Sequence, residues 1–377
     1  MSGKTFLYTG GYTMPTKLGS GETVDPGCPG IICFSWDEEQ GTLTRLHTTR
    51  EGADNTTWVM IDPKGMTLYA VNEMKQFGDA EGGAVAAYRI DPENGKITYI
   101  GRQVSAGTDP CHLTMAADGK YVICANYSGG SFCSFPVRED GSLAPLACLL
   151  RHVGSGPDSS RQEMPHPHQI LHAPGEAGDS CVYIADLGLD QLVCYEVDPR
   201  TGWLQPSKRP PVCAKPGQGS RHACFNADGT RLYVITEMAC EVNVYRYDPA
   251  TGENELLQII SAMGTRVSEN DQECLGAEIH IGPTGKQLYA SVRRSNHIAV
   301  FDIGQDGTLT LKQTIRSGGE IPRDFIISPG GNYLLAGNQD TGNIVIFRID
   351  PADGTLSVHG ECREAQGATV LALCCIG

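Results

Sequence analysis

A basic and an acidic side chain flank one short hairpin of the sequence at the same end. Residues 219–238 read GSRHACFNADGTRLYVITEM, in which an Asp228-Gly229 turn joins two apolar stretches. Arg221 stands eight residues before Gly229 and Glu237 eight residues after it, so antiparallel pairing places them opposite each other at the open end. A carboxylate there can act as a base towards water, and a guanidinium can stabilise an oxyanion. The two groups can equally form a structural ion pair, and His222, beside them, can be a structural histidine.

Other hairpins carry titratable side chains at the corresponding end. Counting from the turns predicts these positions there: Glu73 at the end of a second strand, His168 facing the Asp186 region with His166 just before it, Glu278 and His280 facing Arg293, and Arg323 with Asp324 facing Asn338 and Gln339. The opposite hairpin ends carry only turn residues. This asymmetry predicts a binding pocket where the open ends meet, although Glu278 and Asp186 can instead serve only to orient neighbouring side chains.

A repeat that runs through the chain supplies the elements that position these groups. It consists of an aromatic residue, a polar turn with a glycine and a short polar strand. Seven copies begin at residues 34, 88, 135, 195, 245, 301 and 347, spaced 46 to 60 residues apart. Six hairpins of alternating apolar and polar residues, such as HLTMAADGKYVICANY at 112, lie between them. Each unit therefore holds four antiparallel strands.

The two ends of the chain supply the missing seventh hairpin. The segment GATVLALCCIG near the C-terminus resembles a first strand without a turn, and TFLYTGGYT near the N-terminus resembles a second strand. Joined in space they complete a seventh unit, and radial closure of this kind buries the inner strands. The sequence thus predicts an all-β fold, a seven-bladed β-propeller closed by its N- and C-terminal strands, with residues 1–377 as a single domain.

Composition excludes several classes of partner. The net charge of −15 argues against nucleic acid and against an anionic membrane surface. We expect the segment MSGKTFLYTGGYT to form a strand rather than a signal peptide, and no apolar run is long enough to span a bilayer. The 15 cysteines form no CxxC pair and lie within apolar strands, as small core residues do in a reducing cytosol. We expect a cytoplasmic protein, a monomer or homo-oligomer, that needs no cofactor.

Metal binding is a rival interpretation of the histidines. His166, His168 and His172 are close in sequence, and Glu73 and Asp186 could join them. No cysteine takes part, however, and neither an H-E-x-x-H motif nor zinc-ribbon spacing occurs. The sequence also lacks a G-x-S-x-G elbow and a P-loop. The expectation is therefore a site without metal.

Several stretches together resemble the lactonase family of seven-bladed propellers. They are RQEMPHPHQ, IADLGLDQLVCYEVDP, GSRHACFNADGTRLYVITEM, AEIHIGPTGKQLYASVRRSNHIAVF and IPRDFIISPGGNYLLAGNQDTGNIVIFRIDP. The resemblance covers essentially the whole chain and is strongest from residue 161 to 350. That family includes bacterial 6-phosphogluconolactonases and the fungal carboxymuconate lactonizing enzyme. Around the charged residues the family usually has GPRH, NEL and Asn-Arg-Gly, whereas this chain has Gly219-Ser220-Arg221-His222, Thr236-Glu237-Met238 and Val292-Arg293-Arg294.

The resemblance implies hydrolysis of a phosphorylated sugar δ-lactone. By similarity to the lactonizing enzyme, the matching residues His168, Arg221, Glu237 and Arg293 carry the chemistry. Glu237 or His168 would be the base, Arg221 would stabilise the oxyanion, and Arg293 with Arg323 would hold the phosphate. The remaining predicted substrate-binding residues are Glu73, His166, Asp186, His222 and His280.

Two other functions fit the same residues. Cyclisation of a carboxymuconate also needs arginines for carboxylates and one proton donor, so the same mouth would serve it. A non-catalytic propeller would bind an anion or a protein at its mouth, and would carry exposed aromatic side chains around the rim rather than a charged ring.

Overall fold

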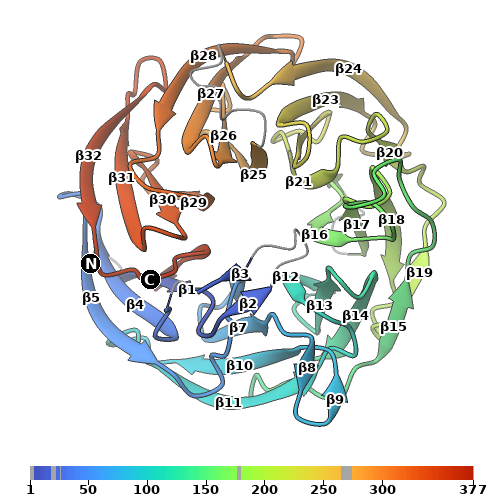
Figure 1. Cartoon of the computed structure of the whole chain (residues 1–377), viewed down its shortest axis with the longest axis vertical. Coiled ribbons are helices and arrows are strands. Elements are labelled where there is room, and N and C mark those ends of the chain that lie inside the picture. The colour runs from blue at the N-terminus through green and yellow to red at the C-terminus, as the bar shows by residue number, and fades with distance from the viewer. Residues whose placement is uncertain are drawn as a thin grey trace.

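The strands of the protein form seven antiparallel sheets arranged radially around a central axis (Figure 1). The computed structural model describes residues 4–17, 23–25, 27–116, 118–175, 180–264 and 274–376. Each sheet is a blade of four or five strands, with its first strand at the centre of the ring and its last at the rim. The all-β, seven-bladed prediction is therefore confirmed. No helix in these described ranges has the length and apolar character needed to cross a membrane.

Both ends of the chain build the first blade, as predicted. Its strands, from the centre outward, are β33 (Val370–Ile376), β1 (Lys4–Gly10), β4 (Ile31–Asp37) and β5 (Thr42–Thr49). The register runs from Lys4 opposite Ile376 to Gly10 opposite Val370. Figure 1 shows the two ends side by side at this blade. A short ribbon of β2 (Thr16–Lys17) and β3 (Thr23–Val24) follows β1.

The other six blades follow in chain order. Blade two holds β6 (Val59–Ile61), β7 (Thr67–Asn72), β10 (Ala84–Ile90) and β11 (Ile97–Val104), with a ribbon of β8 (Gln76–Phe77) and β9 (Ala80–Glu81). Blade three holds β12 (Pro110–Ala116), β13 (Tyr121–Asn126), β14 (Ser131–Pro136) and β15 (Cys148–Arg151). Blade four holds β16 (Pro167–His172), β17 (Cys181–Asp186), β18 (Gln191–Val197), β19 (Leu204–Pro206) and β20 (Val212–Cys213).

The last three blades each have four strands. Blade five holds β21 (Ser220–Phe225), β22 (Arg231–Thr236), β23 (Glu241–Tyr247) and β24 (Asn254–Ser261). Blade six holds β25 (Leu275–Ile281), β26 (Gln287–Arg293), β27 (His297–Ile303) and β28 (Leu309–Arg316). Blade seven holds β29 (Pro322–Ile327), β30 (Tyr333–Asn338), β31 (Asn343–Ile349) and β32 (Leu356–Cys362).

Apolar clusters join each blade to the next. One cluster joins Tyr8 of blade one with Tyr88 of blade two, and corresponding clusters lie at the six other junctions, including the one between blades seven and one. Apolar burial of this kind is the main stabilising contribution in such a ring. Both faces of the middle strands are consequently covered, which explains why β7, β13, β17 and β30 are buried along their whole length.

The glycine of the repeat fastens neighbouring blades together. A buried tyrosine of one blade donates its hydroxyl to that glycine's carbonyl in the next blade, at 2.8 to 2.9 Å, in four pairs: Tyr8 to Gly95, Tyr69 to Gly141, Tyr233 to Gly307 and Tyr289 to Gly354. These glycines have φ between 71° and 84°, a conformation that side chains disfavour. At Gly95 a Cβ would also lie 2.5 Å from the Phe6 ring.

Candidate active site

A β-bulge occurs near the same end of the first strand in blades three to seven. The pairing of the first two strands is interrupted once in each. The residues inserted there are Cys111, His168, Arg221, Ala277 with Glu278, and Arg323. A bulge leaves its extra residue outside the ladder and re-aims the side chain. Five inner strands thereby turn such residues towards one end of the central channel.

The bulges correct the facing pairs that counting predicted. Thr236 pairs with Ser220, and the Glu237 N–H donates to the Gly219 carbonyl at 2.7 Å, so Arg221 is not directly opposite Glu237. Arg293 pairs with Leu275 rather than with Glu278 or His280. Charged and histidine side chains from several blades nevertheless meet in one place, as expected. One pocket is lined by His168, Glu237, Arg293, Arg323 and Glu73.

This pocket lies at the mouth of the channel and encloses about 720 Å³, counting its open side. Its remaining lining residues are Tyr12, Val24, Cys111, Tyr127, Arg161, Leu275, Arg294, Ile321, Gln339 and Asp340. Four arginines and three carboxylates are thus gathered in a protein whose net charge is −15. An anion would find its positive partners here despite the acidic surface.

Glu237 is the centre of an arginine cluster. Its Oε2 accepts from Arg221 Nε at 3.1 Å and from Arg293 Nη2 at 2.7 Å, and its Oε1 accepts from Arg161 Nη2. Burial alone would raise the pKa of Glu237, but the charges of Arg293, Arg161 and Arg221 together hold it well below its ordinary value. The carboxylate is therefore a permanently charged, weakly basic group that holds three guanidinium groups in place.

Arg221 lies beneath the pocket rather than on its surface. It is 2% exposed, and its Nη1 donates to the Ala277 carbonyl at 2.6 Å. Burial, followed by the charge of Arg293, lowers the pKa of Arg221 to about 10. Arg221 therefore has no exposed face with which to contact an oxyanion, contrary to the prediction. Its hydrogen bonds to Glu237 and Ala277 instead make it a support behind Glu237.

Arg323 and Glu73 occupy the opposite wall. The Tyr12 hydroxyl donates to Glu73 Oε1 at 2.6 Å, and Arg323 Nη1 donates to the Tyr12 hydroxyl at 3.2 Å and to Gln339 Oε1 at 3.3 Å. The nearest carboxylate oxygen to Arg323 is on Glu73, at 3.7 Å from Nη2. The charge of Arg323 is consequently less neutralised than that of Arg161 or Arg293, both of which hydrogen-bond to Glu237.

A chain of three buried side chains leads from the pocket into the channel. His168 Nδ1 lies 3.0 Å from His222 Nε2, and His222 Nδ1 lies 2.8 Å from Glu278 Oε2. Burial is the largest cause that lowers the pKa of both histidines, and for His168 the charge of Arg221 adds to it. Burial would raise the pKa of Glu278, but His222 lowers it to about 2. A charged carboxylate thus lies below two neutral imidazoles.

Three other predicted site residues lie outside this pocket. Asp186 is fully buried and accepts from the His166 backbone N–H at 2.7 Å, while its Oδ2 lies 2.6 Å from His152 Nδ1. The His166 ring stacks on Tyr127 at 4.6 Å between centroids. His280 lies beyond the bulge of β25, opposite Tyr289. Asp186 and His166 thus hold the wall behind the pocket, and neither is placed to touch a ligand in it.

The metal set that the sequence suggested is not assembled. The His166 ring nitrogen Nδ1 lies 3.1 Å from the Tyr127 carbonyl, and His172 Nε2 lies 3.0 Å from the Thr114 hydroxyl. His168 is engaged with His222. A different group, Glu278, His280 and Asp324, brings potential ligand atoms close together.

Counting from the hairpin turns missed Arg161, which comes from the long connection between β15 and β16. The repeats at 135 and 195 are 60 residues apart, the widest interval in the chain. This long connection could have indicated Arg161 as a site residue, since long loops on a repeat scaffold often carry functional residues.

Comparisons with known proteins show which family the chain belongs to. A family model described as a seven-bladed β-propeller lactonase matches residues 6–373. The 6-phosphogluconolactonase of Bacillus subtilis is 34% identical over 88% of this chain and 90% of its own, and that of Formosa agariphila is 31% identical over 94% and 98%.

Solved structures of similar proteins cover nearly the whole chain. A Pseudomonas aeruginosa periplasmic gluconolactonase superposes with a TM-score of 0.87 at 26% identity, over 99% of this chain and 100% of that one. A Bacteroides fragilis structure superposes with a TM-score of 0.85 at 31% identity, over 98% of both chains. With the family model spanning almost every residue, the chain belongs to the lactonase family of seven-bladed β-propellers.

Proposed function

We propose that the protein hydrolyses a phosphorylated sugar δ-lactone, 6-phosphogluconolactone, at the pocket in the channel mouth. Family membership and the names of the Bacillus subtilis and Formosa agariphila relatives support this activity. The arginine-lined pocket supports an anionic substrate. The observation that carries the mechanism is the chain from His168 through His222 to Glu278.

The hydrogen bonds from His168 through His222 to Glu278 determine which ring nitrogens carry protons. The ionised Glu278 carboxylate can only accept, so His222 carries its proton on Nδ1 and its Nε2 accepts from His168 Nδ1. His168 Nε2 is then unprotonated. Because its lowered pKa keeps His168 neutral near pH 7, that nitrogen can take a proton from water. We therefore assign the base to His168 rather than to Glu237, whose lone pairs already serve three arginines.

The reaction then follows in two proton transfers. His168 Nε2 removes a proton from water as the water oxygen attacks the lactone carbonyl, and the two cluster arginines that line the pocket, Arg161 and Arg293, stabilise the developing oxyanion. The ring C–O bond breaks, and His168 returns the proton to the departing alkoxide. The products are a carboxylic acid and a free hydroxyl group. His222 and Glu278 act through His168 as positioning residues.

The phosphate is assigned to Arg323, with Arg293 beside it. Among Arg161, Arg293 and Arg323, the charge of Arg323 is the least neutralised. Arg161 and Arg293 hydrogen-bond to Glu237, whereas the nearest described carboxylate oxygen to Arg323 is 3.7 Å away. Guanidinium groups suit phosphate because they offer paired donors. Arg161 and Arg293, tied to Glu237, supply a fixed positive wall.

We also propose that residues 1–377 form one domain and that the protein acts in the cytoplasm. The apolar clusters that link every blade to the next support a single unit. All 15 cysteines are free thiols, and 10 of them are buried, as in proteins of a reducing compartment. Fractionation with a compartment marker tests the location, which matters because one structural relative is periplasmic.

One assay tests the function. Proton release from freshly made 6-phosphogluconolactone is followed above the spontaneous rate, beside the absorbance of carboxymuconate, for the wild type and His168→Gln. We expect the wild type to turn over the lactone and His168→Gln to have lost this turnover. His47→Gln, at a half-buried histidine of β5 in the rim strand of blade one, is the matched control. Turnover of carboxymuconate only, or of neither substrate, overturns the proposal, and the latter outcome favours a binding function.

A further inference from the structure

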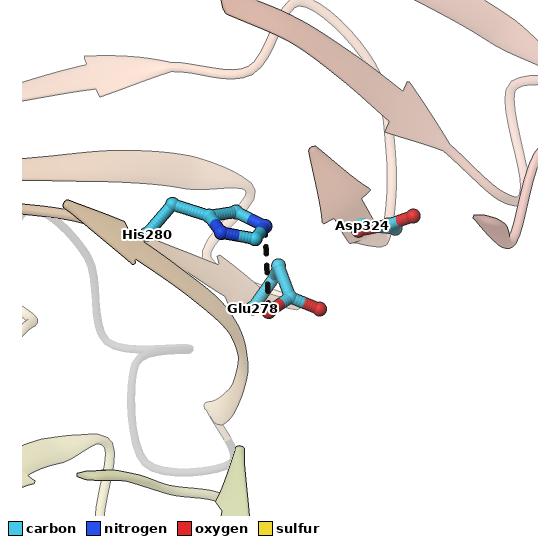
Figure 2. Close-up of side chains that lie close together, drawn as sticks. All are labelled: Glu278, His280 and Asp324. Atoms are coloured by element: carbon cyan, nitrogen blue, oxygen red, sulfur yellow. Dashed lines mark ion pairs between the residues drawn. The ribbon is translucent and has the colours of Figure 1, made fainter. Parts of the chain in front are cut away.

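Three side chains of the types that bind metals converge in the channel below the pocket. Glu278 and His280 come from β25, and Asp324 comes from β29 of the next blade. One ligand atom from each lies within 4.8 Å of the other two, and Glu278 Oε1 is 3.7 Å from His280 Nε2. In Figure 2 the His280 ring and the Asp324 carboxylate lie on two sides of Glu278.

The two carboxylates are held by other groups in a way that metal ligands require. Glu278 Oε2 lies 2.8 Å from His222 Nδ1, and Glu278 Oε1 accepts from the Ile279 N–H at 3.0 Å. Asp324 Oδ2 accepts from the Leu371 N–H at 2.6 Å. Hydrogen bonds of this kind fix the orientation of ligating carboxylates. The fold thus restricts the orientation of two of the three ligands.

The group brings two buried carboxyl groups together, and burial followed by the charge of Glu278 raises the pKa of Asp324 well above its ordinary value. A bound cation would take the place of that proton. Glu278 and Asp324 are 2% and 4% exposed, and in the described part of the chain neither forms an ion pair with a lysine or arginine. Adjacent buried carboxylates repel each other and lose hydration. The His280 side chain is 43% exposed, so an ion has a route to the group.

We propose that Glu278, His280 and Asp324 form a binding site for one divalent transition-metal cation of the zinc class. Imidazole with carboxylates suits Zn²⁺, whereas Ca²⁺ and Mg²⁺ take oxygen ligands. Ligand atoms about 2.1 Å from one ion are at most about 4.2 Å apart, so small side-chain rotations close the present separations. Water completes the coordination. This site goes beyond the lactonase activity and revises the expectation from the sequence that no metal is bound.

The test measures binding of Zn²⁺ itself. The full-length protein is treated with a chelator, and Zn²⁺ is titrated in competition with a chromogenic chelator, with the bound metal counted by elemental analysis. We expect one ion per chain. Loss of a metal's supporting group alone typically weakens binding 10- to 100-fold, so His280→Ala and Asp324→Asn, which remove ligands, should each weaken it at least that much. His47→Ala should change nothing, and Ca²⁺ should not compete.

The variants keep the result interpretable. Asparagine retains an acceptor for the Leu371 N–H, and His280 is partly exposed, so both proteins should fold. Circular dichroism checks this. Absence of stoichiometric Zn²⁺ in the wild type, or equal affinity in folded His280→Ala, overturns the proposal. Lactone turnover is not the readout, so the metal site and the proposed function can fail separately.

Discussion

Replacing Glu278 with glutamine should disable the proposed base without altering the pocket wall. Glu278 Oε1 accepts from the Ile279 N–H at 3.0 Å, so a glutamine places its carbonyl there and its NH₂ group towards His222. The amide then donates to His222 Nδ1, which moves the histidine proton to Nε2. His222 in turn donates to His168 Nδ1, and His168 carries its proton on Nε2. The lone pair that faces water is lost.

The magnitude follows from the role of a base. General base catalysis contributes about 10²- to 10⁴-fold in rate, which corresponds to about 3–5 kcal/mol in the barrier. Glu278 does not line the pocket, so kcat should fall by that factor while KM changes little. Glutamine has nearly the same volume as glutamate, so the packing around the site should be kept.

The assay uses chelator-treated protein and freshly made 6-phosphogluconolactone, with kcat and KM determined separately and Tm measured in parallel. The matched control is Glu255→Gln, at a surface carboxylate that pairs with Arg246. A folded Glu278→Gln protein with kcat within about threefold of the wild type, far short of the loss expected for a missing base, would refute the proton arrangement.

Four further outcomes are expected. Because burial and neighbouring positive charge lower the pKa of His168, kcat/KM should stay level down to about pH 6.5 and fall only below it. The free energy of unfolding should fall in the same acidic range, because the histidine of the unfolded protein binds protons first. A profile of kcat/KM that declines from pH 8 would contradict this. Arg323→Ala should raise KM about 10- to 100-fold, the worth of a charge-assisted hydrogen bond, with kcat nearly unchanged; steady-state kinetics that show the reverse would exclude a phosphate-binding role. Glu237→Gln should lower the free energy of unfolding by about 3–5 kcal/mol in urea, since it leaves buried arginines without their counter-charge; a loss below about 1 kcal/mol would show that the cluster does not need it. Tyr289→Phe should lower that free energy by about 1–3 kcal/mol by leaving the Gly354 carbonyl unpaired, with turnover retained, and an unchanged urea midpoint would show that this fastening is dispensable.

The repeat made the fold readable from the sequence. Alternating strands and regularly recurring turn glycines specify blades, and the presence of only six hairpins for seven repeat motifs required the two ends of the chain to pair, as Lys4 and Ile376 do. The meeting of charged residues at one mouth also followed, because every blade offers the same end of its first two strands. These features depend on periodicity alone, which a single sequence displays directly.

The details of the site depended on features that periodicity hides. Counting from a turn assumes one-to-one pairing, and a bulge adds one residue to a single strand, so Arg221 shifts out of register with Glu237. Arg161 enters from an insertion outside the repeat. Asp186 follows the pattern of the other ring residues, yet it is engaged by His152 behind the pocket.

The pairing of β33 with β1, which closes the ring, has a consequence for how the protein folds during synthesis. The ribosome synthesises β1 before its inner neighbour β33, and at about 5–20 residues per second the interval between them is about 20–75 s. For that time one margin of β1 has no partner, which makes the nascent chain a candidate client for chaperones. Catalytic competence should therefore arise abruptly once β33 has been synthesised, rather than accumulate blade by blade.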